Sequence, residues 1–135
     1  MAGIYQATSY ALNAGGWALE EAEDHVTFTP ADIDAALIIS SFTKEAGAIS
    51  SEDLRNMSAG GAPAVALRKP VTYGDFTGFR AEYDDPDATH WRVYWLAHDR
   101  THLYITYNCH IDYVGRHDAV VDWMLSTLTA GASAA

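Results

Sequence analysis

The chain has little of what marks a secreted or nucleic-acid-binding protein. Cys109 is its only cysteine, so no disulfide can form within the chain. Lysine and arginine number only 8 against 18 aspartates and glutamates, which gives a formal net charge of −10 with neutral histidines. Binding a phosphate backbone requires clustered basic residues, so we expect no nucleic-acid partner. The negative charge instead suits a basic protein partner, because it would accelerate their encounter.

The chain also has no long hydrophobic run. No stretch approaches the roughly 20 apolar residues of a membrane span, and no cationic segment precedes an apolar run near the N-terminus. We therefore expect a cytoplasmic protein without membrane contact. Hydrophobic residues make up 49% of the 135 positions, which favours one folded domain over residues 1–135. Its ordered core is predicted at about 4–128, with a flexible tail of small residues at 129–135.

The segment 90–110 predicts a long β-hairpin with two different faces. Its residues alternate with a period of two and are interrupted once, at 99–101. The odd positions are Trp91, Val93, Trp95, Ala97, Leu103, Ile105, Tyr107 and Cys109. The even positions are His90, Arg92, Tyr94, Leu96, His98, His102, Tyr104, Thr106, Asn108 and His110. A three-residue loop at 99–101 pairs odd with odd positions, for example Trp95 with Ile105, so all odd side chains share one face.

This odd face is predicted to be the core. Burying one large apolar side chain is worth about 1.5–3 kcal/mol, more than the roughly 0.2–1 kcal/mol of a cross-strand pair on the even face. The even face is then exposed, with tyrosine and leucine among polar side chains. Tyrosine and arginine are enriched at interface hot spots. We therefore predict a partner-binding surface of Arg92, Tyr94, Leu96 and Tyr104, which is also open to homodimerisation or to cover by the N-terminal segment.

The same register predicts two facing histidine pairs, His90 with His110 and His98 with His102. Opposed side chains in a sheet are close enough to share a metal ion. A zinc or iron site needs three or four ligands, and the spacing fixes no third one. We therefore predict no metal and no cofactor. A metal-dependent hydrolase or lyase that uses these histidines is the alternative function.

Further strands are predicted from alternation and turn residues. They cover residues 4–11, 17–20, 25–29, 36–42, 64–67, 71–73 and 77–83. The nearly continuous apolar run at 36–42 is typical of a central strand covered on both faces. Between two of these strands, Glu20, Glu21, Glu23 and Asp24 form an acidic run that suits a solvated edge or turn.

Two helices complete the predicted fold. Ser50 and Asp53 have the spacing of a capping box, so a short helix begins there and ends near Met57. A second helix is predicted at 114–128, where apolar residues form a stripe and Asp112 caps the start. The second helix is expected to pack on the odd face of the hairpin. The result is an α+β fold: one antiparallel sheet of six to seven strands with a C-terminal helix and a short mid-chain helix packed on it.

In this order, the elements resemble the PsbP-like fold family. The resemblance rests on Trp17 before Val26-Thr-Phe-Thr-Pro30, on the strand Leu37-Ile-Ile-Ser-Ser-Phe42, and on the capped helix near Ser50. It continues with Gly78-Phe79, Trp91-Arg-Val-Tyr-Trp95, Leu103-Tyr-Ile-Thr-Tyr-Asn-Cys109 and a terminal amphipathic helix. The family includes a photosystem extrinsic subunit, a Ran-binding nuclear-import factor and many small bacterial proteins. The resemblance implies a binding or structural role, such as a bacterial immunity or secretion-accessory protein.

The residues that could support catalysis do not form a recognisable motif. Cys109 and His110 are adjacent in a predicted strand, so their side chains point to opposite faces. No G-x-S-x-G nucleophile elbow and no phosphate-binding loop is present in the sequence. The sequence therefore predicts a non-catalytic domain that binds another protein.

Overall fold

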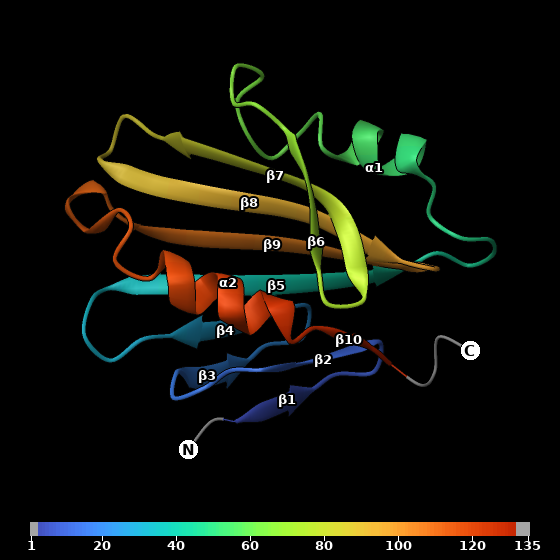
Figure 1. The fold of residues 1–135 in the computed structure, drawn as a ribbon, viewed down its shortest axis with the longest axis horizontal. Helices are drawn as coiled ribbons and strands as arrows, with labels where there is room; N and C mark the ends of the chain where they lie inside the picture. The colour runs from blue at the N-terminus through green and yellow to red at the C-terminus, as the bar shows by residue number, and fades with distance from the viewer. Residues whose placement is uncertain (1–2, 132–135) are drawn as a thin grey trace.

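The computed structural model describes residues 3–131 and has the predicted α+β architecture (Figure 1). The strands are β1 (Ile4–Gln6), β2 (Tyr10–Asn13), β3 (Ala18–Glu21), β4 (Val26–Thr29), β5 (Ala35–Thr43), β6 (Lys69–Tyr73), β7 (Phe76–Asp84), β8 (Thr89–His98), β9 (Thr101–His110) and β10 (Thr129–Ala130). The helices are α1 (Ser51–Met57), the 3₁₀ turn η1 (Ile111–Tyr113) and α2 (Asp118–Ser126). Among these residues, no helix is long and apolar enough to cross a membrane.

The strands form two sheets instead of the single sheet predicted. The larger is an antiparallel seven-stranded sheet in the order β3-β4-β5-β9-β8-β7-β6. The smaller has the order β1-β2-β10. The strand predicted at 4–11 is divided into β1 and β2, and the strand predicted at 64–67 does not form. Part of the predicted flexible tail is also wrong, because Thr129 and Ala130 pair with β2; residues 132–135 lie outside the described part of the chain.

The hairpin turn is one residue shorter than predicted, and this changes every partner in β8 and β9. Asp99 and Arg100 alone make the turn, with Asp99 in the left-handed region at φ 52°. His98 therefore pairs with Thr101, and Trp95 pairs with Tyr104 instead of Ile105. Backbone N–H groups of Lys44 and Ile49 donate to the carbonyls of Arg100 and Asp99, which holds the turn from outside. An offset of one residue exchanges the two faces of one strand relative to its partner.

As a result, both faces of β8 are buried and the predicted single core face is wrong. Even residues of β8 share a face with odd residues of β9, and this face lies under α2 and the small sheet (Figure 1). Its core includes Phe28, Leu37, Ile105, Met124 and Leu125, each at most 1% exposed. The opposite face holds the odd residues of β8 and is covered by α1 and the loop 58–68. The prediction that the C-terminal helix packs on the odd residues of β8 is therefore wrong, because α2 covers its even residues.

The helix α1 follows its local sequence, whereas α2 is shorter than predicted. Ser50 accepts from the backbone of Asp53, and the Asp53 carboxylate accepts from the backbone of Ser50, as the capping box requires. The predicted helix at 114–128 begins only at Asp118, because Gly115 adopts φ 88° and ends the preceding η1 turn. Asp112 does not cap it: the η1 turn is capped by His110.

One arginine organises the loop over the second face. The Arg68 guanidinium donates to the carbonyls of Ser58, Ala62, Pro63 and Ala66. Its central carbon also lies 5.3 Å from the ring centre of Trp95, a cation–π distance. Through these contacts a loop without helix or strand seals the aromatic side of β8.

Candidate functional site

The surface predicted from the hairpin is not exposed. Tyr94 and Leu96 are 0% exposed and Arg92 is 2% exposed, all beneath α2 or beside it. Tyr104 belongs to the opposite face, where it contacts Trp95. The four residues therefore form no common surface in the folded chain. The exposure on which this binding prediction depended is wrong, because α2 and the small sheet cover one face of β8 and the two-residue turn places Tyr104 on the other face.

The histidine pairs are also separated. His90 faces α2 whereas His110 lies on the other face of β9, and the same holds for His98 and His102. Within residues 3–131, no group of three or more His, Cys, Asp or Glu side chains is arranged to hold a metal ion. The alternative function, a metal-dependent hydrolase or lyase, therefore has no support from the positions of these histidines.

A charged cluster occupies the corner of the sheet where β7 and β8 pass the start of α2. His90 Nδ1 lies 2.6 Å from Asp84 Oδ1, and His90 Nε2 lies 2.9 Å from Glu82 Oε2. The register explains these contacts, because Asp84 is paired directly with His90 on the same face. Both ring nitrogens are thus engaged by carboxylates, so neither is free to serve as a general base.

Arg92 is the buried cation of this cluster. Its Nη1 and Nη2 atoms lie 3.4 Å from Asp118 and 3.1 Å from Asp122 at the start of α2, and its Nε lies 3.9 Å from Glu82. Burial works to lower the pKa of Arg92, but Tyr94, Asp122 and Asp118 together raise it, so the guanidinium stays charged. The cluster therefore joins α2 to the sheet, and we assign it a structural role.

Cys109 and two tyrosines lie close to this corner without forming a reactive site. Burial raises the pKa of the Cys109 thiol, which keeps it protonated at neutral pH. The hydroxyls of Tyr94 and Tyr107 and the Nε of Arg92 are buried and have no hydrogen-bond partner in the described part of the chain. No nucleophile activated by a neighbouring base results from this arrangement.

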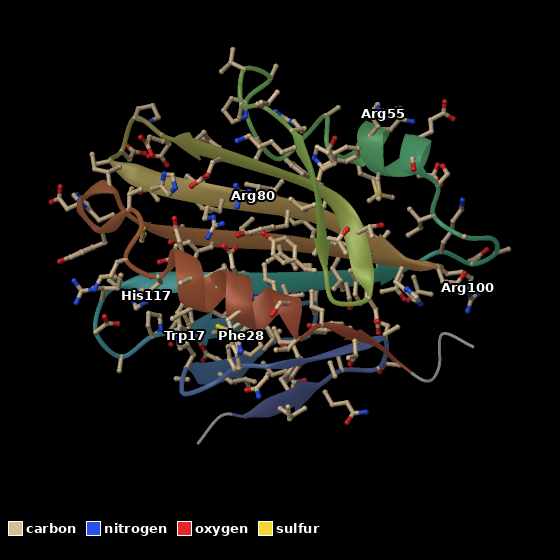
Figure 2. The ribbon with its side chains drawn as sticks, in the orientation of Figure 1. Trp17, Phe28, Arg55, Arg80, Arg100 and His117 are labelled. Atoms are coloured by element: carbon tan, nitrogen blue, oxygen red, sulfur yellow. The ribbon has the colours of Figure 1, made fainter. Side chains whose placement is uncertain are left out.

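A different site lies at the opposite edge of the sheet, between the free edges of β1 and β3. A groove of about 590 Å³ is bounded by these two strands, the turn before β3 and the end of β4. Its lining residues are Gly3, Ile4, Tyr5, Gly16, Trp17, Ala18, Leu19, Thr29, Pro30 and Ala31. Ile4 is 70% exposed and Leu19 is 41% exposed, so large apolar side chains face solvent here. Figure 2 shows Trp17 and Phe28 between the strands next to the groove and α2.

Acidic side chains continue along β3 from this groove, although none of them belongs to its lining. Glu20 and Glu21 belong to β3 and are exposed, and Glu23 and Asp24 follow in the turn to β4. Tyr5 of β1 donates a 2.9 Å hydrogen bond to Glu21, which links the two strands across the groove. Burial and the neighbouring Glu21 raise the pKa of Tyr5 to about 12, so its hydroxyl remains a donor at neutral pH.

Sequence reasoning identified part of this groove. The acidic run was predicted as a solvated edge, and β3 is an edge strand. The apolar side of the groove was missed, because Ile4 and Leu19 are isolated apolar residues in weakly alternating segments. Only the position of β1 beside β3, which depends on a separate small sheet, brings them together.

Comparisons with known proteins support the fold and no further assignment. No model of a known protein family matches the chain, and no curated protein sequence matches it. A crystal structure from Bacteroides thetaiotaomicron is similar over 96% of this chain, with a TM-score of 0.70 and 15% sequence identity. The match covers 49% of that structure, so this chain spans about half its length. At this identity the similarity shows a shared fold alone.

Proposed function

We propose that the protein is a non-catalytic binding domain that adds an extended, basic segment of a partner protein to the free edge of β3. The observation that carries this proposal is an edge strand, β3, that has exposed apolar side chains beside a groove at one end and exposed acidic side chains at the other. Such an accessory role also agrees with what the PsbP-like resemblance implies.

An extended segment suits the geometry of this site. β3 is the last strand of the large sheet, so one row of its backbone N–H and C=O groups has no strand partner among residues 3–131. Peptides commonly bind such edges as an added strand, with main-chain hydrogen bonds for affinity and side-chain pockets for specificity. The groove beside Leu19 would take one alternate apolar side chain of the added strand.

A basic partner is favoured over a second copy of this chain. Two β3 strands side by side would bring Glu20 and Glu21 of one copy against those of the other, and like charges across strands are destabilising. Lysines or arginines at those positions would form opposite-charge pairs instead. The net charge of −10 also favours encounter with a basic protein.

Calorimetric titration with a nine-residue peptide of alternating lysine and valine tests the proposal. We expect binding that weakens with added salt and no binding of the glutamate–valine counterpart. Charge reversal by Glu20→Lys with Glu23→Lys should weaken binding roughly tenfold, since each exposed ion pair contributes about 0.2–1 kcal/mol and reversal adds repulsion.

The matched control is Glu45→Lys with Glu52→Lys, which changes the net charge equally at the other end of the molecule. Hydrogen exchange supplies the structural readout: amides of residues 18–21 should become protected when the peptide is bound. Equal weakening by both double variants, or unchanged exchange in β3, would show that the peptide binds only through net charge, and the proposal would fail.

A further inference from the structure

A second cavity lies on the opposite face of the large sheet, between α1 and the end of β5. It encloses about 270 Å³ and is lined by Phe42, Thr43, Lys44, Ile49, Asp53, Met57 and His102. None of these residues belongs to the groove at β3. Phe42 is 57% exposed and Met57 is 41% exposed, so the cavity opens to solvent between apolar side chains.

The wall of this cavity carries a fixed aromatic platform. Phe42 pairs with His102 in the register of β5 and β9, and their rings stack with centres 5.9 Å apart and planes inclined by 21°. His102 is only 6% exposed. Beside it, Lys44 Nζ lies 3.2 Å from Asp53 Oδ2, and Asp53 is itself held by the capping box of α1. The local charges of the rim thus neutralise each other.

The hydrogen bonding of His102 determines what it offers to a ligand. Its Nδ1 lies 3.0 Å from the carbonyl oxygen of Leu96, and a carbonyl can only accept, so Nδ1 carries the proton. Burial lowers the pKa of His102 despite this hydrogen bond, so the ring is neutral at pH 7. Nε2 is then an acceptor, and it makes no hydrogen bond to the part of the chain that the structure describes.

We propose that this cavity binds a small planar aromatic molecule with one N–H or O–H donor, which stacks beside Phe42 and donates to Nε2 of His102. An apolar cavity of about 150 Å³ can hold benzene, so 270 Å³ has room for a two-ring molecule of the size of indole. This site is independent of the proposed partner groove, since the two share no residue.

Titration with indole and with indene, the same shape without the N–H, tests the proposal. The chain has three methionines, and selective ¹³C-methyl labelling reports on Met57 in the cavity and on Met124, which lies on the buried side of α2. We expect indole to shift the Met57 methyl signal with saturation and to leave Met124 unchanged. Indene should bind about 3- to 10-fold more weakly, the contribution of one net hydrogen bond.

Two variants separate the parts of the site. Phe42→Ala, at an exposed position, should weaken indole binding roughly fivefold or more by removing the stacked ring. His102→Phe should abolish the preference for indole over indene. Equal affinity of indole and indene for the unmodified protein, or joint shifts of Met57 and Met124, would overturn the proposal whether or not the His102 variant folds.

Discussion

The two faces of β8 are both buried, but they are buried by different means. Towards α1, β8 presents Trp91, Val93, Trp95 and Ala97, a surface of apolar side chains. Towards α2 it presents His90, Arg92, Tyr94 and Leu96, of which two are ionisable groups paired with carboxylates. The difference follows from position: the charged residues lie at the corner of the sheet, where Asp118 and Asp122 remain about half exposed. A strand can therefore be buried on both sides without being hydrophobic on both.

The largest expected loss of stability comes from a substitution on the apolar face of β8. Trp95→Ala should lower the free energy of unfolding by about 3–5 kcal/mol, because Trp95 is 2% exposed and its removal leaves a cavity beneath Arg68. Urea denaturation measures the change. Trp123→Ala is the control, since Trp123 is 47% exposed and should cost less than about 1 kcal/mol. Equal losses for the two variants would contradict the burial described for β8.

On the charged face, removing the charges of Asp118 and Asp122 should lower the free energy of unfolding, because their partner Arg92 is buried. The double change Asp118→Asn with Asp122→Asn leaves Arg92 with only Glu82, at 3.9 Å, and should cost about 1–3 kcal/mol. This is less than for a fully buried pair, because solvent screens the half-exposed carboxylates. Asp34→Asn with Glu45→Gln removes the same charge from exposed positions and should be nearly neutral in the same denaturation experiment.

His102 should produce a smaller, pH-dependent effect on the α1 side. Its pKa in the folded chain lies below the ordinary value of 6.5, so the unfolded chain binds a proton first as the pH falls. Stability from this residue is therefore complete above about pH 6.5 and decreases as the pH falls through the folded pKa. His102→Gln should reduce the loss of stability between pH 7 and pH 5. Parallel pH profiles of the two proteins in thermal unfolding would refute this assignment.

The smallest expected effect is at Tyr94. Its buried hydroxyl has no hydrogen-bond partner among the residues that the structure describes, so Tyr94→Phe should leave stability unchanged or raise it by up to about 1 kcal/mol. Tyr73→Phe is the matched comparison, because the Tyr73 hydroxyl donates to Asp122 at 3.3 Å and its loss should be slightly destabilising. A marked loss of stability in Tyr94→Phe would indicate a partner such as a buried water.

The features that sequence predicted well are local ones. The start of the short helix α1 is fixed by Ser50 and Asp53, which are three residues apart and interact directly. The apolar run that forms β5 was likewise predicted as a central strand, and β5 lies between β4 and β9. In both cases the determining contacts or patterns lie within a few residues, so alternation and capping suffice.

The hairpin shows where this reasoning fails. The alternation within β8 and within β9 was recognised, but their relative register depends on a single backbone conformation at Asp99. Side-chain pattern gave no choice between a two-residue and a three-residue turn. The assumption that a strand has one core face then selected the wrong register, because the loop 58–68 that covers the other face has no pattern of its own.

Of the candidate groove and its surroundings, only the acidic run on β3 could be predicted from the sequence. The acidic residues beside the groove lie within residues 20–24 of the sequence, whereas Ile4 and Leu19 are brought together by the packing of two sheets. The two facing histidine pairs were predicted from the three-residue turn, so they were wrong once the turn proved to have two residues. Sites assembled from separate elements require the topology first.

The loop fixed by Arg68 has a consequence for how the sequence could vary. Residues 59–64 are Ala, Gly, Gly, Ala, Pro and Ala, whose side chains have few atoms with which to hold a shape. The conformation of the segment is instead encoded by one guanidinium that lies outside it and bridges four of its neighbouring carbonyls. Apart from Gly61, whose φ of 83° favours glycine, the segment should therefore tolerate replacement by other small residues. Position 68 should accept no substitute, since lysine has neither the planar fork nor the number of donors.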